Sequence, residues 1–254
     1  MGKVSKSLLD DINHQIRRKS KLIQWKNSFE VLEWFDNITD KSNLTFVKFD
    51  VVEFYPSISK SLVLKALKFA NEFVRVSEAD KDILHAYKTV LIHDSQAWTK
   101  RTGNKNSLFD IPMGSFHGAE ICELVGLLIL HKLSERFSIS NFGLYRDDGL
   151  MVIDRRPRRF MDKCAGTIKS TFENLGLKVT IEGPAAKVDF LDVTMDLLND
   201  RYEPYQKSNS NPRYISNLSN HPPCIKRGLP GMIQKRISRL SKSKKEFDGI
   251  KAKY

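Results

Sequence analysis

The sequence lacks several features, and each absence excludes a class of protein. It has no apolar run of roughly eighteen residues, so no membrane-spanning helix is predicted. Its first residues contain no apolar segment of the kind that a secretory signal peptide needs. Only three cysteines occur in 254 residues, widely spaced, which argues against a disulfide scaffold and favours reduced thiols in an intracellular protein. No internal repeat is present, so a solenoid is not expected.

Acidic side chains are outnumbered, with 30 Asp and Glu against 42 Lys and Arg and a formal net charge of +12. After residue 205, twelve Lys and Arg occur with only two acids, so this segment contributes ten of the twelve net charges. A one-sided basic segment is typical of a protein that binds a phosphate backbone, although solubilising tails also have it. Apolar residues recur at helical spacing from Leu229 to Leu240, which favours an amphipathic helix with a basic face. The candidate nucleic-acid-binding residues are Lys226, Arg227, Lys235, Arg236 and Arg239.

The pair Asp147-Asp148 stands between two apolar runs, residues 142–145 and 150–153. Two such runs joined by a turn that includes Asp148-Gly149 predict a β-hairpin with both acids at its tip. Adjacent carboxylates repel each other unless a cation lies between them, and carboxylate oxygens are the ligands that Mg²⁺ prefers. The alternative is an ordinary solvated Asp-Gly turn, since short motifs often occur by chance.

A second acid, Asp50, has a comparable context. Residues 46–51 are β-branched and aromatic, which predicts a buried strand, and Pro56 is expected to end it. Ser59 is expected to cap the helix that follows. Asp50 is then either a surface acid where the strand emerges or a partner of the Asp147-Asp148 hairpin. The second interpretation suggests a two-metal site, in which cations about 3.5–4 Å apart activate a hydroxyl and steady a leaving phosphate oxygen.

The remaining periodicities indicate an α+β domain. Residues 115–136 are mostly apolar and predict a long helix, and residues 160–175 predict an amphipathic helix that ends at Gly176. Residues 177–181 and 188–198 predict strands. Helices and antiparallel hairpins are interspersed along the chain, which is the pattern of the α+β class.

The acids belong to a longer set of motifs that resembles the reverse transcriptases. Residues 49–58 resemble polymerase motif A, residues 111–115 resemble motif B, and Tyr-Arg-Asp-Asp at 145–148 resembles the Y-x-D-D box of motif C. Lys187 with residues 190–193 resembles the region where motifs D and E meet. The four motifs occur in the family's order over nearly the whole chain. Further strings are similar to the Penelope-like retroelement branch, at residues 24–28 with 34–35, 118–126 and 219–223.

The resemblance implies a right-hand polymerase palm, with a split βαβ unit, an antiparallel sheet and packed helices. We expect partial fingers or a helical lead-in at residues 1–45, the palm at 46–200 and a partial, basic thumb at 201–254. The implied activity is RNA-directed DNA polymerisation by a two-metal mechanism, with Mg²⁺, or Mn²⁺, as the cofactor. The implied partners are an RNA or DNA template with its primer and deoxynucleoside triphosphates, with no membrane and in an intracellular, nuclear setting.

The family motifs assign the reaction chemistry to a few residues of this sequence. Asp50 and Asp147 would bind the metal, and Asp148 would be the supporting acid of the box. Lys187 would be the general acid that protonates pyrophosphate, unless it is simply a solvated lysine. The resemblance therefore predicts a catalytic set of three carboxylates and one lysine.

The same motifs assign the contacts with the nucleotide. Tyr55 would be the sugar gate, whose ring excludes a 2′-hydroxyl, unless it is a core aromatic at the end of the strand. Val51, Met113 and Gly114 would line the nucleotide site, and Gly114 would let the motif B loop approach closely. Many relatives carry Gln where this chain has Met113, so a hydrogen bond from that position is not expected here.

Two departures from the family pattern leave a second function open. The basic fingers residues that grip the triphosphate upstream of motif A have no convincing counterpart, and neither a fuller thumb nor a nuclease domain is visible. A catalytically weak or inactive remnant that only binds nucleic acid is therefore the alternative to an RNA-directed DNA polymerase. A viral type of RNA-dependent RNA polymerase is disfavoured by Tyr55 and by the Penelope-like strings.

Overall fold

The computed structural model describes residues 2–80, 91–93, 96–98, 111, 116–205, 215–216 and 218–251. The chain divides into two compact units. Unit 1 comprises Met1–Trp25, Val47–Met151 and Arg156–Gly183, and unit 2 comprises Lys26–Phe46, Val152–Arg155 and Pro184–Tyr254. Within the described ranges, no helix is both long and apolar enough to cross a membrane.

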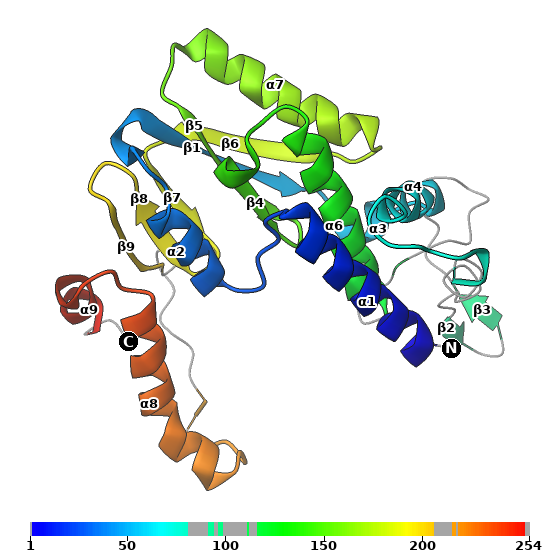
Figure 1. The fold of residues 1–254 in the computed structure, drawn as a ribbon. Helices are drawn as coiled ribbons and strands as arrows, with labels where there is room; N and C mark the ends of the chain where they lie inside the picture. The colour runs from blue at the N-terminus through cyan, green and yellow to red at the C-terminus, as the bar shows by residue number, and fades with distance from the viewer. Residues whose placement is uncertain are drawn as a thin grey trace. The chain divides into compact units, whose positions relative to one another are not determined.

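A four-stranded sheet carries the segments that hold the predicted acids (Figure 1). β-branched and aromatic residues favour the extended conformation, and those of β1 are mostly buried, as expected for a core strand. Strands β4 and β5 form an antiparallel hairpin in which Phe142 pairs with Met151 and Tyr145 pairs with Asp148. The strand order is β4 (Phe142–Tyr145), β5 (Asp148–Asp154), β1 (Leu44–Val51) and β6 (Val179–Ala185).

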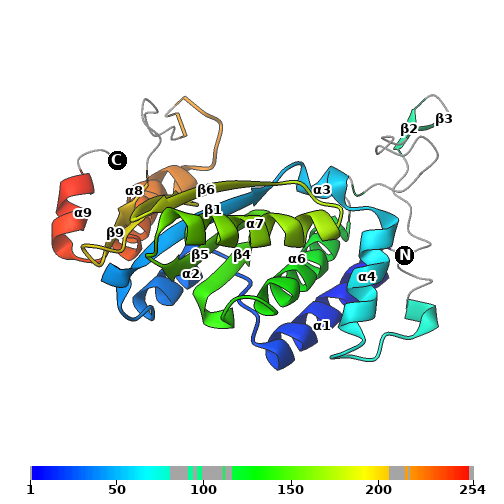
Figure 2. The ribbon, with the colours of Figure 1, turned by 90° about the horizontal axis from the view of Figure 1, so that it is seen from above.

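Helix α7 covers one face of this sheet in unit 1 (Figures 1 and 2). Its apolar residues recur at helical spacing, so Met161, Cys164, Ile168 and Phe172 share one buried face. Phe172 meets Phe49 of β1, with the ring centroids 5.7 Å apart. Helix α6 is buried along most of its length, and α1 and α4 pack against it. In the described part of unit 1 the helices are α1 (Gly2–Ser20), α3 (Phe54–Ser57), α4 (Lys60–Ala70), α6 (Gly118–Ser134) and α7 (Arg158–Asn174), with the 3₁₀ helix η2 (Ile139–Asn141) and the hairpin β2 (Leu91–His93)–β3 (Gln96–Trp98).

Unit 2 is built on a three-stranded antiparallel sheet of order β7-β8-β9. Phe35 of α2 is fully buried and lies edge-on to Tyr202 of β9, with the centroids 6.1 Å apart. Lys242, between α8 and α9, pairs with Asp36 at 3.2 Å and with Asp200 at 2.8 Å, and so ties the C-terminal segment to this core. The elements are α2 (Ser28–Asp36), η1 (Lys41–Asn43), β7 (Lys187–Phe190), β8 (Val193–Asp196), β9 (Arg201–Pro204), α8 (Pro223–Arg239) and α9 (Lys244–Lys251).

The α+β class is confirmed, and the path of the chain after β1 corrects one local prediction. Ser59 caps α4 as expected, since its Oγ accepts a hydrogen bond from the Leu62 N–H at 3.2 Å. Pro56 does not end the strand. Strand β1 ends at Val51, Glu53 turns the chain at a φ of +48°, and Pro56 lies inside α3.

The predicted strand at residues 188–198 is instead the β7–β8 hairpin. The two strands are separated by Leu191, which takes the left-handed conformation at a φ of +54°, and by Asp192. Gly176 follows α7 as expected, with a φ of +78° that suits the residue after a helix C-terminus.

Candidate active site

The tip of the β4–β5 hairpin is formed by Arg146 and Asp147. Tyr145 and Asp148 are the last strand pair, so the sequence predicts the hairpin correctly, but Asp148 and Gly149 belong to β5 and not to the turn. Arg146 takes the left-handed conformation, with a φ of +55°. Gly149 lies on β5, where an added Cβ would overlap the ring of Phe49. Glycine is therefore needed there for close packing and not for the turn.

The end of β1 and the hairpin turn bring the three predicted acids together in unit 1. The Val51 N–H donates to the carbonyl oxygen of Asp147 at 3.2 Å, which ties the residue after Asp50 to the turn. On the β6 side, the Thr180 hydroxyl donates to the carbonyl oxygen of Asp50 at 3.4 Å. Asp148 is the first residue of β5, the neighbour of β1 in the sheet. Hydrogen bonds to the backbone carbonyl groups of Asp50 and Asp147 thus hold the positions from which these carboxylates project.

Burial and mutual repulsion raise the pKa of two of these acids. Burial, followed by the negative charges of Asp147 and Asp50, raises the pKa of Asp148 to about 6. Burial, followed by the charge of Asp147, also raises the pKa of Asp50. A carboxylate whose ionised form is disfavoured in this way gains most from a neighbouring cation. The site is therefore electrostatically suited to positive charge.

Sequence reasoning missed a Lys48–Glu182 pair beside the acids. Lys48 precedes Asp50 by two residues, so both side chains lie on the same face of β1. The Lys48 ammonium lies 3.7 Å from Glu182 of β6. The charge of Lys48 lowers the pKa of Asp50 and of Asp148, while that of Glu182 raises both. The alternation of side chains along a strand could have identified Lys48 from the sequence. Its contact with Glu182 can be seen only in the folded structure.

Mg²⁺ fits the donor set at this place. Among the described residues, no group of three or more His, Cys, Asp and Glu side chains is arranged to hold a metal ion by itself. Mg²⁺, however, is usually held by one or two carboxylates, with water and substrate phosphates completing its octahedron. Asp50 and Asp147 are carboxylates of the required kind, and Asp148 adds negative charge beside them. The site thus suits a hard cation that arrives with a phosphate ligand.

Tyr55, the predicted sugar gate, is half-buried in α3. Burial raises the pKa of its hydroxyl and also that of the thiol of Cys122 on α6, the latter to about 12. The charges of Arg146 and Asp147 act on the same two groups, which places the pair beside the hairpin turn. Cys122 fell within an apolar helical pattern in the sequence, and its place beside the hairpin turn needed the fold to be seen.

The other predicted site residues are placed as follows. Val51 is buried at the end of β1 and binds the turn through its backbone, as described above. Lys187 lies in unit 2 on β7, where its ammonium is 3.7 Å from the Glu203 carboxylate. Met113 and Gly114 lie outside the described residues. The roles of Lys187, Met113 and Gly114 stay predictions.

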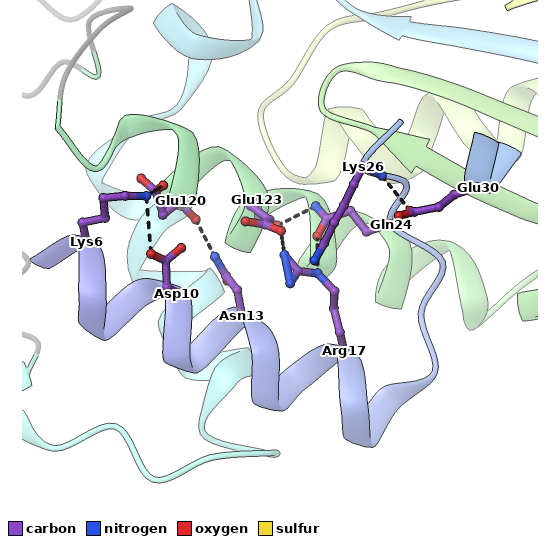
Figure 3. A network of polar contacts seen from close by, with 9 residues as sticks. All are labelled: Lys6, Asp10, Asn13, Arg17, Gln24, Lys26, Glu30, Glu120 and Glu123. Carbon is purple, nitrogen blue, oxygen red and sulfur yellow. Dashed lines mark hydrogen bonds and ion pairs between the residues drawn. The ribbon is translucent and has the colours of Figure 1, made fainter. Parts of the chain in front are cut away.

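Two of the strings that resemble the Penelope-like branch meet in unit 1, at the junction of α1 and α6 (Figure 3). The side-chain amide of Gln24 donates to the carbonyl oxygen of Glu123 at 2.9 Å. Arg17 of α1 pairs with the carboxylate of the same glutamate. A Cβ at Gly126 would lie 2.7 Å from the Gln24 side-chain nitrogen, so a larger residue there would force the Gln24 amide to shift. The two segments that contain these strings are therefore closely packed against each other.

The same segment adds a parallel bridge to the edge of β4. The Leu144 N–H donates to the carbonyl oxygen of Ile23 at 3.2 Å, and the Trp25 N–H donates to that of Leu144 at 2.8 Å. The Trp25 ring is buried against Gly143, where a Cβ would lie 2.5 Å from the ring. This pairing holds the strand that leads directly into the Arg146-Asp147 turn.

Two of the five predicted nucleic-acid-binding residues have partners within unit 2. Arg236 pairs with the carboxylate of Asp192, which also accepts a hydrogen bond from Ser28. The guanidinium of Arg239 lies over the ring of Phe29, 3.5 Å from its centroid. These contacts hold α8 to α2 and to the β7–β8 turn. The other three predicted residues are Lys226, Arg227 and Lys235, of which the last two are exposed.

Solved structures of telomerase are similar to this chain, whereas no protein-family model and no curated protein matches it. Apo telomerase from Candida tropicalis, truncated from its C-terminal domain, matches with a TM-score of 0.53 at 14% identity over 80% of this chain and 45% of that one. Telomerase from Candida tropicalis in complex with a TWJ fragment of telomeric RNA gives 0.55 at 13% identity, over 84% and 39%. The corresponding Candida albicans complex gives 0.50 at 15% identity, over 82% and 38%.

The chain therefore has a reverse-transcriptase-like polymerase fold, with an α+β palm. It spans less than half the length of each of these telomerase chains. At 13–15% identity the likeness extends to the fold alone, so activity has to be argued from the site.

Proposed function

We propose that the chain catalyses templated nucleotidyl transfer as the RNA-directed DNA polymerase of a retroelement related to the Penelope-like branch. The observation that carries the proposal is the meeting of Asp50, Asp147 and Asp148 where β1 ends beside the β4–β5 turn. Two of these acids have raised pKa values, so a cation bound beside them would stabilise their ionised forms. The order of the sequence motifs and the palm fold support the same reaction.

The residues of the site have distinct roles in this reaction. Mg²⁺, when bound, would activate the primer 3′-hydroxyl and neutralise charge on the phosphates. Asp50 and Asp147 would hold that cation through carboxylate oxygens, from the last turn-side residues of β1 and from the β4–β5 turn. Asp148 supports Asp147 from the first position of β5. Lys187 donates a proton to the departing pyrophosphate.

Recognition of the nucleotide and of the duplex falls to other parts of the chain. The ring of Tyr55 excludes a 2′-hydroxyl, and Val51, Met113 and Gly114 complete the nucleotide site. The basic C-terminal segment binds the phosphates of template and primer, mainly through its exposed cations. Arg227 and Lys235 are exposed cations of α8. Binding of this sort is independent of base sequence and weakens with salt.

A primer-extension assay on the full chain tests the proposal. Poly(rA)/oligo(dT) with dTTP should be extended in Mg²⁺ or Mn²⁺ and not in EDTA, and omission of the template should abolish extension. Poly(dA)/oligo(dT) run in parallel reports the template preference. Absence of extension on every template and with either cation would reject the polymerase assignment.

Duplex binding is measured by fluorescence anisotropy on the same preparation. If the chain does not extend the primer, this measurement shows whether it binds nucleic acid without catalysis or whether the preparation has failed. The basic segment supports that alternative, a remnant that binds nucleic acid without catalysis. Tight, salt-sensitive binding without extension would establish the binding function in place of the enzyme. Extension that needs template and cation would establish the enzyme.

A further inference from the structure

The start of α7 carries an exposed basic cluster in unit 1. Strand β5 has seven residues, from Asp148 to Asp154, which span roughly 20 Å at about 3.3 Å per residue. The cluster follows the far end of this strand, so it is separate from the candidate active site. Asp162 is the one acid in the sequence from 156 to 163, and this segment has a net charge of +3. We call the following exposed residues the α7 cluster: Arg156, Arg158, Arg159, Phe160 and Lys163.

The cations of this segment are mostly arginine, although lysine is the commoner cation of the chain. The sequence has 27 lysines and 15 arginines, yet the four cations between residues 155 and 159 are all arginine. A guanidinium presents a planar fork of donors to a phosphate and stacks on flat rings, whereas an ammonium is a strongly hydrated point charge. Solubility requires charge of either kind, so the bias toward arginine favours a phosphate-bearing ligand.

These cations do not stabilise the helix that carries them. Arg158 and Arg159 lie in the first turn of α7, which contains no acid. The N-terminus of a helix has a partial positive charge, so cations there are unfavourable, and neighbouring guanidinium groups also repel one another. Near the other end of α7, by contrast, Lys169 lies 3.9 Å from Glu173 in a favourable i, i+4 pair. A polyanion bound by the arginine side chains would relieve the repulsion at the start of the helix.

Phe160 adds an aromatic surface to these charges. It begins the apolar pattern predicted for this helix, yet its exposed fraction is 40%, whereas that of Met161 is 5%. The guanidinium of Arg156 lies over the Phe160 ring, 5.5 Å from its centroid. Lys163 is three residues further along the helix and therefore neighbours Phe160 on the same side. Unpaired bases stack on exposed rings of this kind while the surrounding cations contact phosphates.

We propose that the α7 cluster binds single-stranded nucleic acid at a surface separate from the candidate active site. The arginines and Lys163 neutralise backbone phosphates, and Phe160 stacks with an unpaired base. A blunt duplex supplies phosphates, but its bases are already stacked on one another, so it engages only the charged part of the cluster. Binding at this surface does not depend on catalysis and thus goes beyond the proposed function.

Fluorescence anisotropy of the full chain with fluorescein-labelled oligo(U) measures the contribution of the charges. Arg158→Gln/Arg159→Gln should make the slope of log K against log salt shallower by roughly 1.4 units, at about 0.7 per phosphate contact on a single strand. Lys65→Gln/Lys68→Gln removes the same charge from exposed positions of α4 and is the matched control, which should leave the slope nearly unchanged. Circular dichroism should show both variants folded, because all four side chains are exposed.

The contribution of the ring is measured with oligo(U) and a blunt RNA–DNA duplex in parallel. Phe160→Ala should weaken binding of oligo(U) by about fivefold or more, the effect of losing one stacked base, and should leave duplex binding nearly unchanged. Phe160→Tyr keeps the ring and should retain the wild-type affinity. Leu64→Ala, which removes an apolar side chain of α4 with an exposed fraction of 41%, is the control and should change neither affinity.

Three results would overturn the proposal. The first is an unchanged oligo(U) affinity and salt slope in both α7 variants, and the second is an equal loss of oligo(U) and duplex binding in Phe160→Ala. The third concerns phosphatidylserine vesicles, since a basic surface with an exposed ring also suits an anionic membrane. Weaker vesicle binding by the α7 variants, with undiminished oligo(U) binding, would assign the cluster to a membrane surface instead. None of these measurements requires primer extension, so failure of the polymerase assignment would leave them interpretable.

Discussion

Asp148 belongs to the candidate site, and its ionisation also affects the stability of the fold. Its pKa is about 6 in the folded chain because it is buried and lies beside two other acids. In the unfolded chain a free aspartate has a pKa of about 3.9. Between these two values the folded state binds more protons than the unfolded state, so the free energy of unfolding falls as pH rises. Below about pH 4 Asp148 is protonated in both states, so it no longer lowers the free energy of unfolding.

The first prediction concerns this pH dependence. In EDTA, the free energy of unfolding of the wild-type chain should fall as pH is raised from about 4 to 6, relative to that of Asp148→Asn, which cannot ionise at this position. Urea titrations at several pH values measure the difference. Mg²⁺ at pH 7 should restore stability to the wild-type chain by binding the folded state. A wild-type-minus-variant difference that is constant with pH would mean that Asp148 is not an unusually weak acid.

Single residues differ in how far the sequence identifies them. Asp50, Asp147 and Asp148 belong to recognisable motifs, so they could be named before the fold was known. Cys122 could not, because nothing in an apolar helical pattern indicates which buried residue lies beside the hairpin turn. Lys48 is intermediate, since the strand period places it on the face of Asp50 but cannot supply its partner on β6.

At the scale of elements, glycine packing holds the β4–β5 hairpin in register. Gly149 on β5 is pressed against Phe49 of β1, and Gly143 on β4 is pressed against Trp25. Both contacts lie within a few residues of the Arg146-Asp147 turn. A side chain at either position would have to displace an aromatic ring in the core of unit 1, and the hairpin would shift with it.

The second prediction compares two glycine substitutions. Gly149→Ala should lower the free energy of unfolding by at least about 1–3 kcal/mol, because the methyl group overpacks the Phe49 ring. Gly166→Ala is the matched control, since this glycine is exposed inside α7 with nothing within 4 Å of an added Cβ. It should raise stability by about 0.5–1 kcal/mol through helix propensity. Equal effects of the two substitutions, measured by urea unfolding, would contradict the packing role of Gly149.

Elements were predicted well where the pattern itself determines them. Alternating apolar runs determined the β4–β5 hairpin, and a serine before a helical repeat determined the cap of α4. The position of the turn could not be predicted, because Gly149 resembles a turn glycine and is in fact a packing glycine. The β7–β8 hairpin was hidden because its turn contains Leu191 in a left-handed conformation, which is uncommon for a residue without a turn preference.

At the scale of the whole molecule, the net charge of +12 indicates a phosphate-rich partner. The structure divides the cations of α8 into two sets. Arg236 and Arg239 contact Asp192 and Phe29 and attach the helix to unit 2. Arg227 and Lys235 are exposed and are suited to neutralise phosphates. The second set should govern the salt dependence of binding.

The third prediction tests this division by salt titration of duplex binding. The double variant Arg227→Ala/Lys235→Ala should make the slope of log K against log salt shallower by roughly two units, at about 0.9 per phosphate contact. Lys65→Ala/Lys68→Ala removes the same charge from the exposed face of α4 and should leave the slope nearly unchanged. Equal changes in the two double variants would show that total charge, and not the C-terminal segment, determines binding.

Fold class and polymerase fold were accessible from the sequence because the four motifs recur in order and each implies its own local structure. The contacts of Arg236 with Asp192 and of Arg239 with Phe29 could not be predicted from the sequence, because they join segments that are far apart in the chain. A basic face on a helix indicates charge but not which cations the protein itself uses.

The most direct test of the central claim is the rate at which a single dTTP is added to a primer in Mg²⁺ by three chains. The wild type and Asp154→Asn, which changes an exposed acid at the opposite end of β5, should add it at similar rates. Asp147→Asn should add it more than about a hundredfold slower, because it removes a charge that holds the cation at the reacting phosphate. Equal rates for Asp147→Asn and Asp154→Asn would contradict the assignment of the hairpin turn as the catalytic site.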